Sequence, residues 1–130
     1  MNYRISHPTK QLFGSTNLTA SKSESNRALI IQALCCERFE IQNLATGEDT
    51  QILQQTLDSF IKNPNSEISY NVGASGTAMR FLTAFFATKT GTSILTGTER
   101  MKKRPIGILV NALRELGADI DYLEEEGFPP

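Results

Sequence analysis

Apolar helices and short strands alternate along this chain, and the alternation restricts it to folds in which helices cover a sheet. Residues 26–36 are almost all apolar and predict a helix that is buried on most sides. A strand is expected over 39–44, followed by a helix over 47–62 with Asp49 as its N-cap. Apolar and polar residues then alternate over 67–72, which predicts another strand with one buried face.

The same order of elements returns in the second half of the chain. Helices are expected over 77–88 and 105–116, and strands over 92–96 and 118–123. Pro105 suits the first position of the last helix, and Gly117 is its expected C-terminal cap. Because helix–strand–helix–strand occurs twice with a period of roughly 50 residues, we predict an α/β fold built from a repeated unit.

The two ends of the chain do not fit inside this repeat. Two further strands are expected near 3–6 and 17–20, and neither has an obvious partner in the repeat. The sequence also stops at Pro130, directly after a predicted strand. At 130 residues the chain has the size of one modest domain, and we expect it to be an N-terminal piece of a longer enzyme.

Composition and charge exclude several classes of function. The formal net charge is −1, so bulk charge favours neither nucleic acid nor an anionic membrane as a partner. No apolar run approaches the roughly 20 residues that a membrane span requires, and the N-terminus has no apolar signal core. We therefore expect a soluble cytoplasmic protein that binds neither nucleic acid nor membrane.

The residues that commonly bind metals are few. Cys35 and Cys36 are adjacent within an apolar run and are expected to be core thiols. His7 is the only histidine and is expected on the surface. A metal site is therefore not expected, and no cofactor is implied.

The strongest functional signal lies where polar residues change into the first apolar run. Lys22, Ser23 and Arg27 belong to the expected first turn of that helix. A helix N-terminus presents free N–H groups and partial positive charge, so two cations there are unfavourable unless an anion binds. This cluster predicts a site for a phosphorylated or carboxylated small molecule.

Two further clusters lie at strand-to-helix turns, where ligands gather in open α/β sheets. Residues 73–80 form a glycine-containing turn into a helix, although it lacks the Gly-Lys-Ser/Thr ending of a Walker loop. Residues 100–104 carry four cations in five positions and lead into the last helix. Either stretch alone is equally compatible with a tight turn or a solvated basic loop.

Three long motifs in this order resemble the 5-enolpyruvylshikimate-3-phosphate synthase family. They are SKSESNRALI (21–30), GASGTAMRFLTAFFA (73–87) and the stretch 99–130. The resemblance implies an α/β fold of two similar domains, each an inside-out α/β barrel made of three βαβαββ units. Residues 1–20 would then be a strand region of the other domain, and 21–130 about two units of one domain, incomplete in this chain.

The resemblance also implies a reaction and its site. The family transfers the enolpyruvyl group of phosphoenolpyruvate to the 5-hydroxyl of shikimate 3-phosphate in the shikimate pathway of aromatic amino acid biosynthesis. Lys22 would contact both substrates, with Ser23 and Arg27 on shikimate 3-phosphate. Gly76 and Arg100 would hold phosphoenolpyruvate, with Lys22 and Arg100 as the catalytic residues. Gly76 would also lie where glyphosate competes in sensitive members.

Several expectations accompany this resemblance. The carboxylates credited with proton transfer in the family lie outside this chain, so the chain alone is expected to be inactive. The intact enzyme is expected to be a monomer, whereas the isolated chain could self-associate through open sheet edges. Ala74 stands where many members have Asn, so a side-chain amide contact is missing there.

Two alternative functions remain open. One is the related enolpyruvyl transferase that acts on UDP-N-acetylglucosamine, which typically has a Lys-Asn pair where this chain has Lys22 and Ser23. The other is a non-catalytic anion-binding module.

Overall fold

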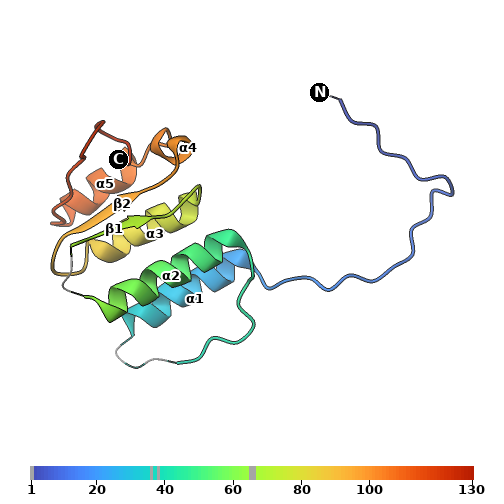
Figure 1. Cartoon of the computed structure of the whole chain (residues 1–130), viewed down its shortest axis with the longest axis horizontal. Helices are drawn as coiled ribbons and strands as arrows, with labels where there is room; N and C mark the ends of the chain where they lie inside the picture. The colour runs from blue at the N-terminus through green and yellow to red at the C-terminus, as the bar shows by residue number, and fades with distance from the viewer. Residues whose placement is uncertain (1, 36, 38, 65–66) are drawn as a thin grey trace.

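A computed structural model describes residues 2–35, 37, 39–64 and 67–130 (Figure 1). Its elements follow in the order α1 (Lys22–Leu34), α2 (Glu48–Lys62), β1 (Ile68–Asn71), α3 (Gly76–Phe86), β2 (Ser93–Thr96), α4 (Glu99–Lys102) and α5 (Gly107–Glu115). Helices and strands therefore share one chain, as the sequence pattern predicts for the α/β class.

The two strands form a parallel pair that α3 connects. Ile68 lies opposite Ser93, and Asn71 lies opposite Thr96. Parallel neighbours need a crossover connection, which α3 supplies. Tyr70 is buried and its neighbours on either side in the strand are exposed, so the alternation predicted for this strand is confirmed.

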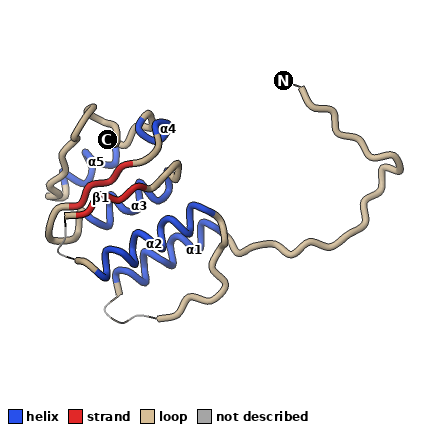
Figure 2. Tube along the Cα trace, in the orientation of Figure 1, coloured by secondary structure: helices blue, strands red, loops and turns tan. Residues whose placement is uncertain are grey.

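Helix α3 is the centre of the packing. It lies between the α1–α2 pair and the sheet and contacts α1, α2, β2 and α5 (Figures 1 and 2). The core is made of apolar side chains that these elements and the adjoining turns contribute: Leu29, Leu53, Leu57, Val72, Ala78, Met79, Leu82, Phe85, Met101, Ile106 and Val110. Because α3 is surrounded on several sides, the position of its N-terminus is fixed by the whole core.

Helix α1 differs from its prediction in both extent and burial. It begins at Lys22, as expected for its polar first turn, because Ser21 caps it by accepting a hydrogen bond from the Glu24 N–H, and it ends at Leu34. The expected burial on most sides is wrong, since the side chains of Ile31 and Leu34 are 56% and 53% exposed. The contacts of α1 with α2 and α3 leave its remaining side uncovered in this chain.

The expectation of core thiols is wrong for Cys35, which is exposed just after the end of α1. Cys36 lies outside the described residues. His7 is exposed, as expected, and its Nδ1 is 3.0 Å from the Thr9 hydroxyl.

Four predicted strands are not strands in this chain. Residues 3–6, 17–20, 39–44 and 118–123 have no strand structure. A strand is stabilised by pairing with a neighbour, and the sheet of the described residues contains only β1 and β2. Ile120 and Tyr122 nevertheless pack against the core, as expected for residues on one face of a segment.

Two residues predicted at helix starts lie one or two positions away from the places expected for them. Asp49 is the second residue of α2 rather than its N-cap, which is Gly47. Pro105 precedes α5, whose N-cap is Ile106. Gly117 does follow the end of α5 with a φ of +94°, the left-handed conformation expected of a helix-ending glycine.

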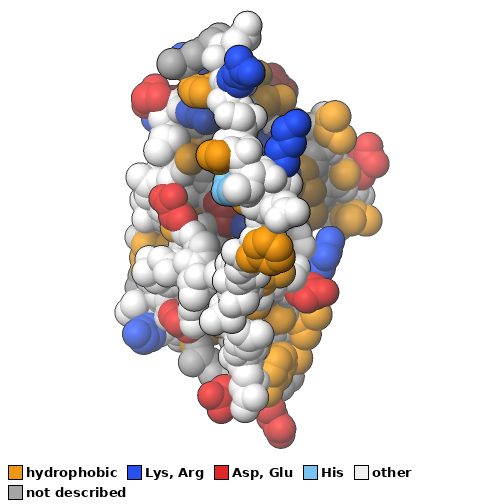
Figure 3. All heavy atoms as spheres, turned by 90° about the vertical axis from the view of Figure 1, so that its right-hand side faces the viewer, with side chains coloured by type: hydrophobic (Ala, Val, Ile, Leu, Met, Phe, Trp, Pro, Cys, Tyr) orange, Lys and Arg blue, Asp and Glu red, His pale blue; other side chains and the backbone are white. Residues whose placement is uncertain are grey.

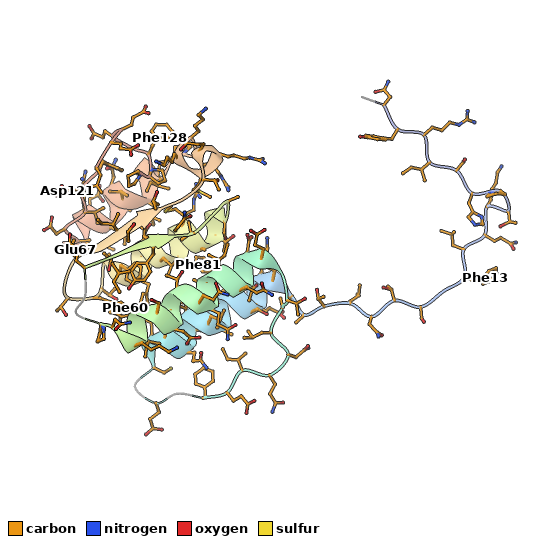
Figure 4. All side chains as sticks on the ribbon, in the orientation of Figure 1. Phe13, Phe60, Glu67, Phe81, Asp121 and Phe128 are labelled. Carbon is orange, nitrogen blue, oxygen red and sulfur yellow. The ribbon has the colours of Figure 1, made fainter. Side chains whose placement is uncertain are left out.

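The N-terminal segment of the chain extends away from the helices and the sheet (Figure 1). Phe13, labelled on this segment in Figure 4, is 92% exposed. On the side from which the segment leaves, positive and negative side chains are intermixed (Figure 3). In the part of the chain that the structure describes, no helix combines the length and apolar character needed to cross a membrane.

Candidate active site

The N-terminal ends of α1, α2 and α3 meet through one carboxylate, that of Asp49. Lys22, the first residue of α1, donates from Nζ to Asp49 Oδ2 over 2.8 Å. Ser75, the N-cap of α3, also stabilises the charged form of Asp49. Three helix N-termini with free N–H groups and partial positive charge therefore lie around one acidic side chain.

The environment of Asp49 lowers the pKa of its carboxyl below 3.8. The hydrogen bond from Lys22 is the largest cause, and partial burial opposes it by raising the pKa. The Ser75 hydroxyl and the positive charges of Lys22 and Arg104 lower it further. Asp49 is therefore ionised at neutral pH, and it neutralises only part of the positive charge around it.

Gly76, the first residue of α3, lies directly beneath the guanidinium of Arg104. A Cβ at Gly76 would be 2.5 Å from Arg104 Cζ and 2.6 Å from its Nη2. Only glycine leaves this space open. The contact brings a cation from the turn between α4 and α5 to the N-terminus of α3, which is far from it in sequence.

Arg80 lies one turn further along α3 and joins the same turn. Its Nη1 donates to the Gly76 carbonyl over 3.1 Å, and its Nη2 donates to the Pro105 carbonyl over 2.9 Å. The Ser75 hydroxyl accepts from the Ala78 N–H over 3.1 Å and so caps α3. The N-terminus of α3 and the turn at Pro105 are therefore tied together by hydrogen bonds.

The predicted site residues are only partly brought together. Lys22 and Gly76 are linked through Asp49, Ser75 and Arg104, as described above. Ser23 and Arg27 are exposed on α1. Arg100 is exposed on the short helix α4, and among the described residues it makes no hydrogen bond or ion pair.

The sequence does not predict the roles that Asp49 and Arg104 have in this cluster. The sequence predicts Asp49 as a helix cap, although a carboxylate one residue inside a helix start can equally accept a hydrogen bond from a neighbouring lysine. Arg104 was one cation in the run 100–104, and nothing local distinguishes it from Arg100. Its position over Gly76 arises only because α4 and the turn at Pro105 fold back against α3.

Buried polar atoms lie close in sequence to this cluster. The Asn26 carboxamide is fully buried in α1, and the Thr50 hydroxyl is buried in α2, directly after Asp49. Within the described residues neither side chain has a hydrogen-bond partner. Burying such atoms without a partner carries a desolvation cost, so these two side chains lower the free energy of unfolding.

A separate cavity lies away from this cluster. It has a volume of about 400 Å³ and lies between the C-terminal part of α3, β2, α5 and the segment 119–130. Among the described residues, no group of three or more His, Cys, Asp or Glu side chains is arranged to hold a metal ion. The cluster at the helix N-termini is thus cationic and glycine-containing, suited to an anion.

The chain is similar to one family of known proteins, both by its family model and by its individual relatives. The family model of EPSP synthase (3-phosphoshikimate 1-carboxyvinyltransferase) matches residues 54–130, more than half of the chain. A 3-phosphoshikimate 1-carboxyvinyltransferase of Bacteroides fragilis (strain YCH46) is 49% identical over 130 residues, covering 100% of this chain and 30% of the relative. The protein of the same name from Sulfurovum sp. (strain NBC37-1) is 40% identical over 150 residues, covering 100% of this chain and 35% of the relative.

A third relative with that name, from Cupriavidus necator, is 39% identical over 140 residues, covering 95% of this chain and 32% of the relative. The chain thus spans about a third of the length of the curated relatives it matches. The matches to these relatives include the start of α1, which the family model does not reach. Because the family model matches more than half of its residues, the chain belongs to the EPSP synthase family.

Proposed function

We propose that the full-length protein containing this chain transfers the enolpyruvyl group of phosphoenolpyruvate to the 5-hydroxyl of shikimate 3-phosphate and releases phosphate. The observation that carries the proposal is the convergence of Lys22, Gly76 and Arg104 at the N-termini of α1 and α3. Both substrates are polyanions, and fixed cations with free N–H groups stabilise the charge that develops during such a reaction.

The proposed roles follow the position of each residue. Lys22 contacts both substrates, while Ser23 and Arg27 on the exposed side of α1 hold shikimate 3-phosphate. Gly76 admits phosphoenolpyruvate close to the backbone, and Arg100 remains a proposed ligand of that substrate. We add Arg104 to the proposed ligands of phosphoenolpyruvate. Its guanidinium already lies at Gly76, and its five N–H donors suit phosphate or carboxylate.

The organisation of the full-length protein is part of the same proposal. Residues 1–20 would contribute a strand region to a second domain, and 21–130 would form about two βαβαββ units of the first. In support, the segment 2–20 makes no strand and extends away from the helices and the sheet (Figure 1). We also propose that the full-length enzyme works in the cytoplasm as a monomer, and that the isolated chain is inactive and self-associates through its open sheet edges.

The test is phosphate release by the full-length protein with phosphoenolpyruvate, in parallel reactions with shikimate 3-phosphate or UDP-N-acetylglucosamine as acceptor. Release that depends on shikimate 3-phosphate is expected. Release only with the sugar nucleotide would instead assign the related transferase, and binding of phosphoenolpyruvate without release would assign an anion-binding module.

A matched pair of variants connects the reaction to the site. Lys22→Ala should abolish turnover without unfolding the protein, because its side chain is 55% exposed. Lys62→Ala is the control, since Lys62 is exposed at the C-terminal end of α2, away from the helix N-termini, and the turnover of this variant should be unchanged. Normal turnover of Lys22→Ala would contradict the proposed site.

A further inference from the structure

We propose that Arg80 is a positioning residue that holds Arg104 over Gly76. The proposal rests on the proposed function in one respect, since it takes the anion bound by Arg104 to be phosphoenolpyruvate. The positioning itself rests on contacts among four residues: Gly76 and Arg80 of α3, and Arg104 and Pro105 of the turn before α5.

The guanidinium of Arg80 bridges two backbone carbonyls from distant parts of the chain. One is that of Gly76 in the first turn of α3, at 3.1 Å, and the other is that of Pro105, at 2.9 Å. Proline has no N–H, so the turn at Pro105 can be held at that residue only through its carbonyl. Arg80 supplies that hydrogen bond, and it does so from a half-buried position within the helix that carries Gly76.

Holding Pro105 restricts Arg104, because the two residues share a peptide unit and the φ of proline is fixed. The Arg104 N–H also donates to the Met101 carbonyl over 2.9 Å, which fixes the other side of the residue. The backbone of Arg104 is therefore held relative to α3 from both sides. Its long side chain is exposed and would otherwise sample many rotamers, at an entropic cost when it binds a ligand.

The two arginines differ in how their donors are used. Arg80 directs its N–H groups to backbone carbonyls, whereas among the described residues the Arg104 guanidinium makes no hydrogen bond or ion pair. Arg104 is thus available to a ligand, and Arg80 is already engaged. Lysine could not replace Arg80, because an ammonium is a point donor and lacks the planar fork that reaches both carbonyls.

The test is a double-mutant cycle in the full-length protein. Arg80→Met, Arg104→Met and the double variant are titrated with inorganic phosphate by calorimetry, and the KM for phosphoenolpyruvate is measured alongside kcat. If Arg80 acts through Arg104, Arg80→Met raises the phosphate Kd and the KM about ten-fold with Arg104 present. The same substitution then changes both by less than about two-fold when Arg104 is already Met.

Arg114→Met is the matched control. Arg114 also donates to a backbone carbonyl, that of Ile120, and its guanidinium lies over the Tyr122 ring, away from Gly76. Its loss should reduce stability without changing the phosphate Kd. If Arg80→Met fails to fold, Arg80→Lys carries the same cycle, since it retains the charge and one donor. An equal effect of the Arg80 substitution in both Arg104 backgrounds would overturn the proposal.

A crystal structure of the Arg80 variant gives a readout that needs no activity. The Arg104 guanidinium should move away from Gly76 once the bond to Pro105 is lost, and an Arg104 that stays over Gly76 would overturn positioning by Arg80. Absence of enolpyruvyl transfer in the parent protein would count against the proposed function alone, so the two failures are distinguishable.

Discussion

Lys22 and Asp49 join the first turns of α1 and α2 through a hydrogen-bonded ion pair of 2.8 Å. The two residues are 27 positions apart in sequence. The pair sets the two helix N-termini side by side and places Lys22 next to the N-cap of α3, through the contribution of Ser75 to the same carboxylate. Lys22 is therefore both a member of a structural ion pair and the proposed substrate-binding cation.

Asp49→Asn should lower the free energy of unfolding at neutral pH by about 1 kcal/mol or less, since Lys22 is half exposed. The folded-state pKa of Asp49 is lowered below 3.8, so the stabilisation is fully present above that value. It is lost as the pH falls through the folded-state pKa. Denaturant unfolding of the chain and the variant should therefore differ at pH 7, and the difference should shrink in acid as the Asp49 carboxylate becomes protonated.

Glu99→Gln is the control for this pH dependence. Glu99 is 3.9 Å from Lys102 and its side chain is 86% exposed, so its removal should hardly change stability at either pH. A stability difference for Asp49→Asn that persists unchanged in acid would contradict the role of the ion pair.

Gly76→Ala should weaken phosphoenolpyruvate binding without unfolding the protein. The added methyl group meets the far end of Arg104, a flexible side chain that can move aside. Loss of one charge-assisted contact raises the KM about ten-fold or more, while the free energy of unfolding stays the same or rises by up to about 1 kcal/mol. Steady-state kinetics and thermal unfolding of the full-length variant check both parts.

Two other glycines provide matched controls. A Cβ at Gly97 would lie 2.6 Å from the Gly73 carbonyl oxygen, which is backbone and cannot move aside. Gly97→Ala should therefore destabilise the fold by about 1–3 kcal/mol. Gly47 has nothing within 4 Å of its Cβ position, so Gly47→Ala should not change the KM. A Gly76→Ala variant with an unchanged KM would place phosphoenolpyruvate away from Gly76.

Ser75→Ala should cost about 1 kcal/mol of stability or more, because Ser75 is 2% exposed and caps α3. It should also raise the pKa of Asp49 toward its ordinary value, since the hydroxyl stabilises the carboxylate. Ser21→Ala removes a longer, exposed cap bond of 3.4 Å and should cost less. Denaturant unfolding measures the stability difference, and an NMR titration of the Asp49 carboxyl measures the pKa.

Arg104→Ala and Arg100→Ala test which of these two arginines contacts phosphoenolpyruvate. The guanidinium of Arg104 is at Gly76, whereas Arg100 is exposed without a partner among the described residues. We expect Arg104→Ala to reduce kcat/KM for phosphoenolpyruvate at least ten-fold, which is the loss of about 1.4 kcal/mol of transition-state binding. A larger loss for Arg100→Ala than for Arg104→Ala would return the proposed contact to Arg100.

The sequence predicts the elements that have both a clear apolar spacing and a packing partner within this chain. Helices α2 and α3 and strands β1 and β2 appear near their expected positions, because their apolar spacing is clear and their partners lie within this chain. The expected strands at 39–44 and 118–123 do not form, because a strand depends on a paired neighbour that periodicity cannot supply.

In the candidate site too, some residues are recognisable from the local sequence and others are placed only by tertiary contacts. Lys22 and Gly76 are recognisable from helix-start chemistry and from the resemblance. Arg104 is not, since its role depends on how the turn at Pro105 folds against α3, which the half-buried Arg80 bridges. Tertiary contacts of this kind have no signature in local composition.

The most direct measurement is a crystal structure of the full-length protein with phosphoenolpyruvate and shikimate 3-phosphate bound. We expect the phosphate or carboxylate of phosphoenolpyruvate within hydrogen-bond distance of Lys22 Nζ and the Arg104 guanidinium, above Gly76. Density for phosphoenolpyruvate at a site that neither Lys22 nor Arg104 contacts would contradict it.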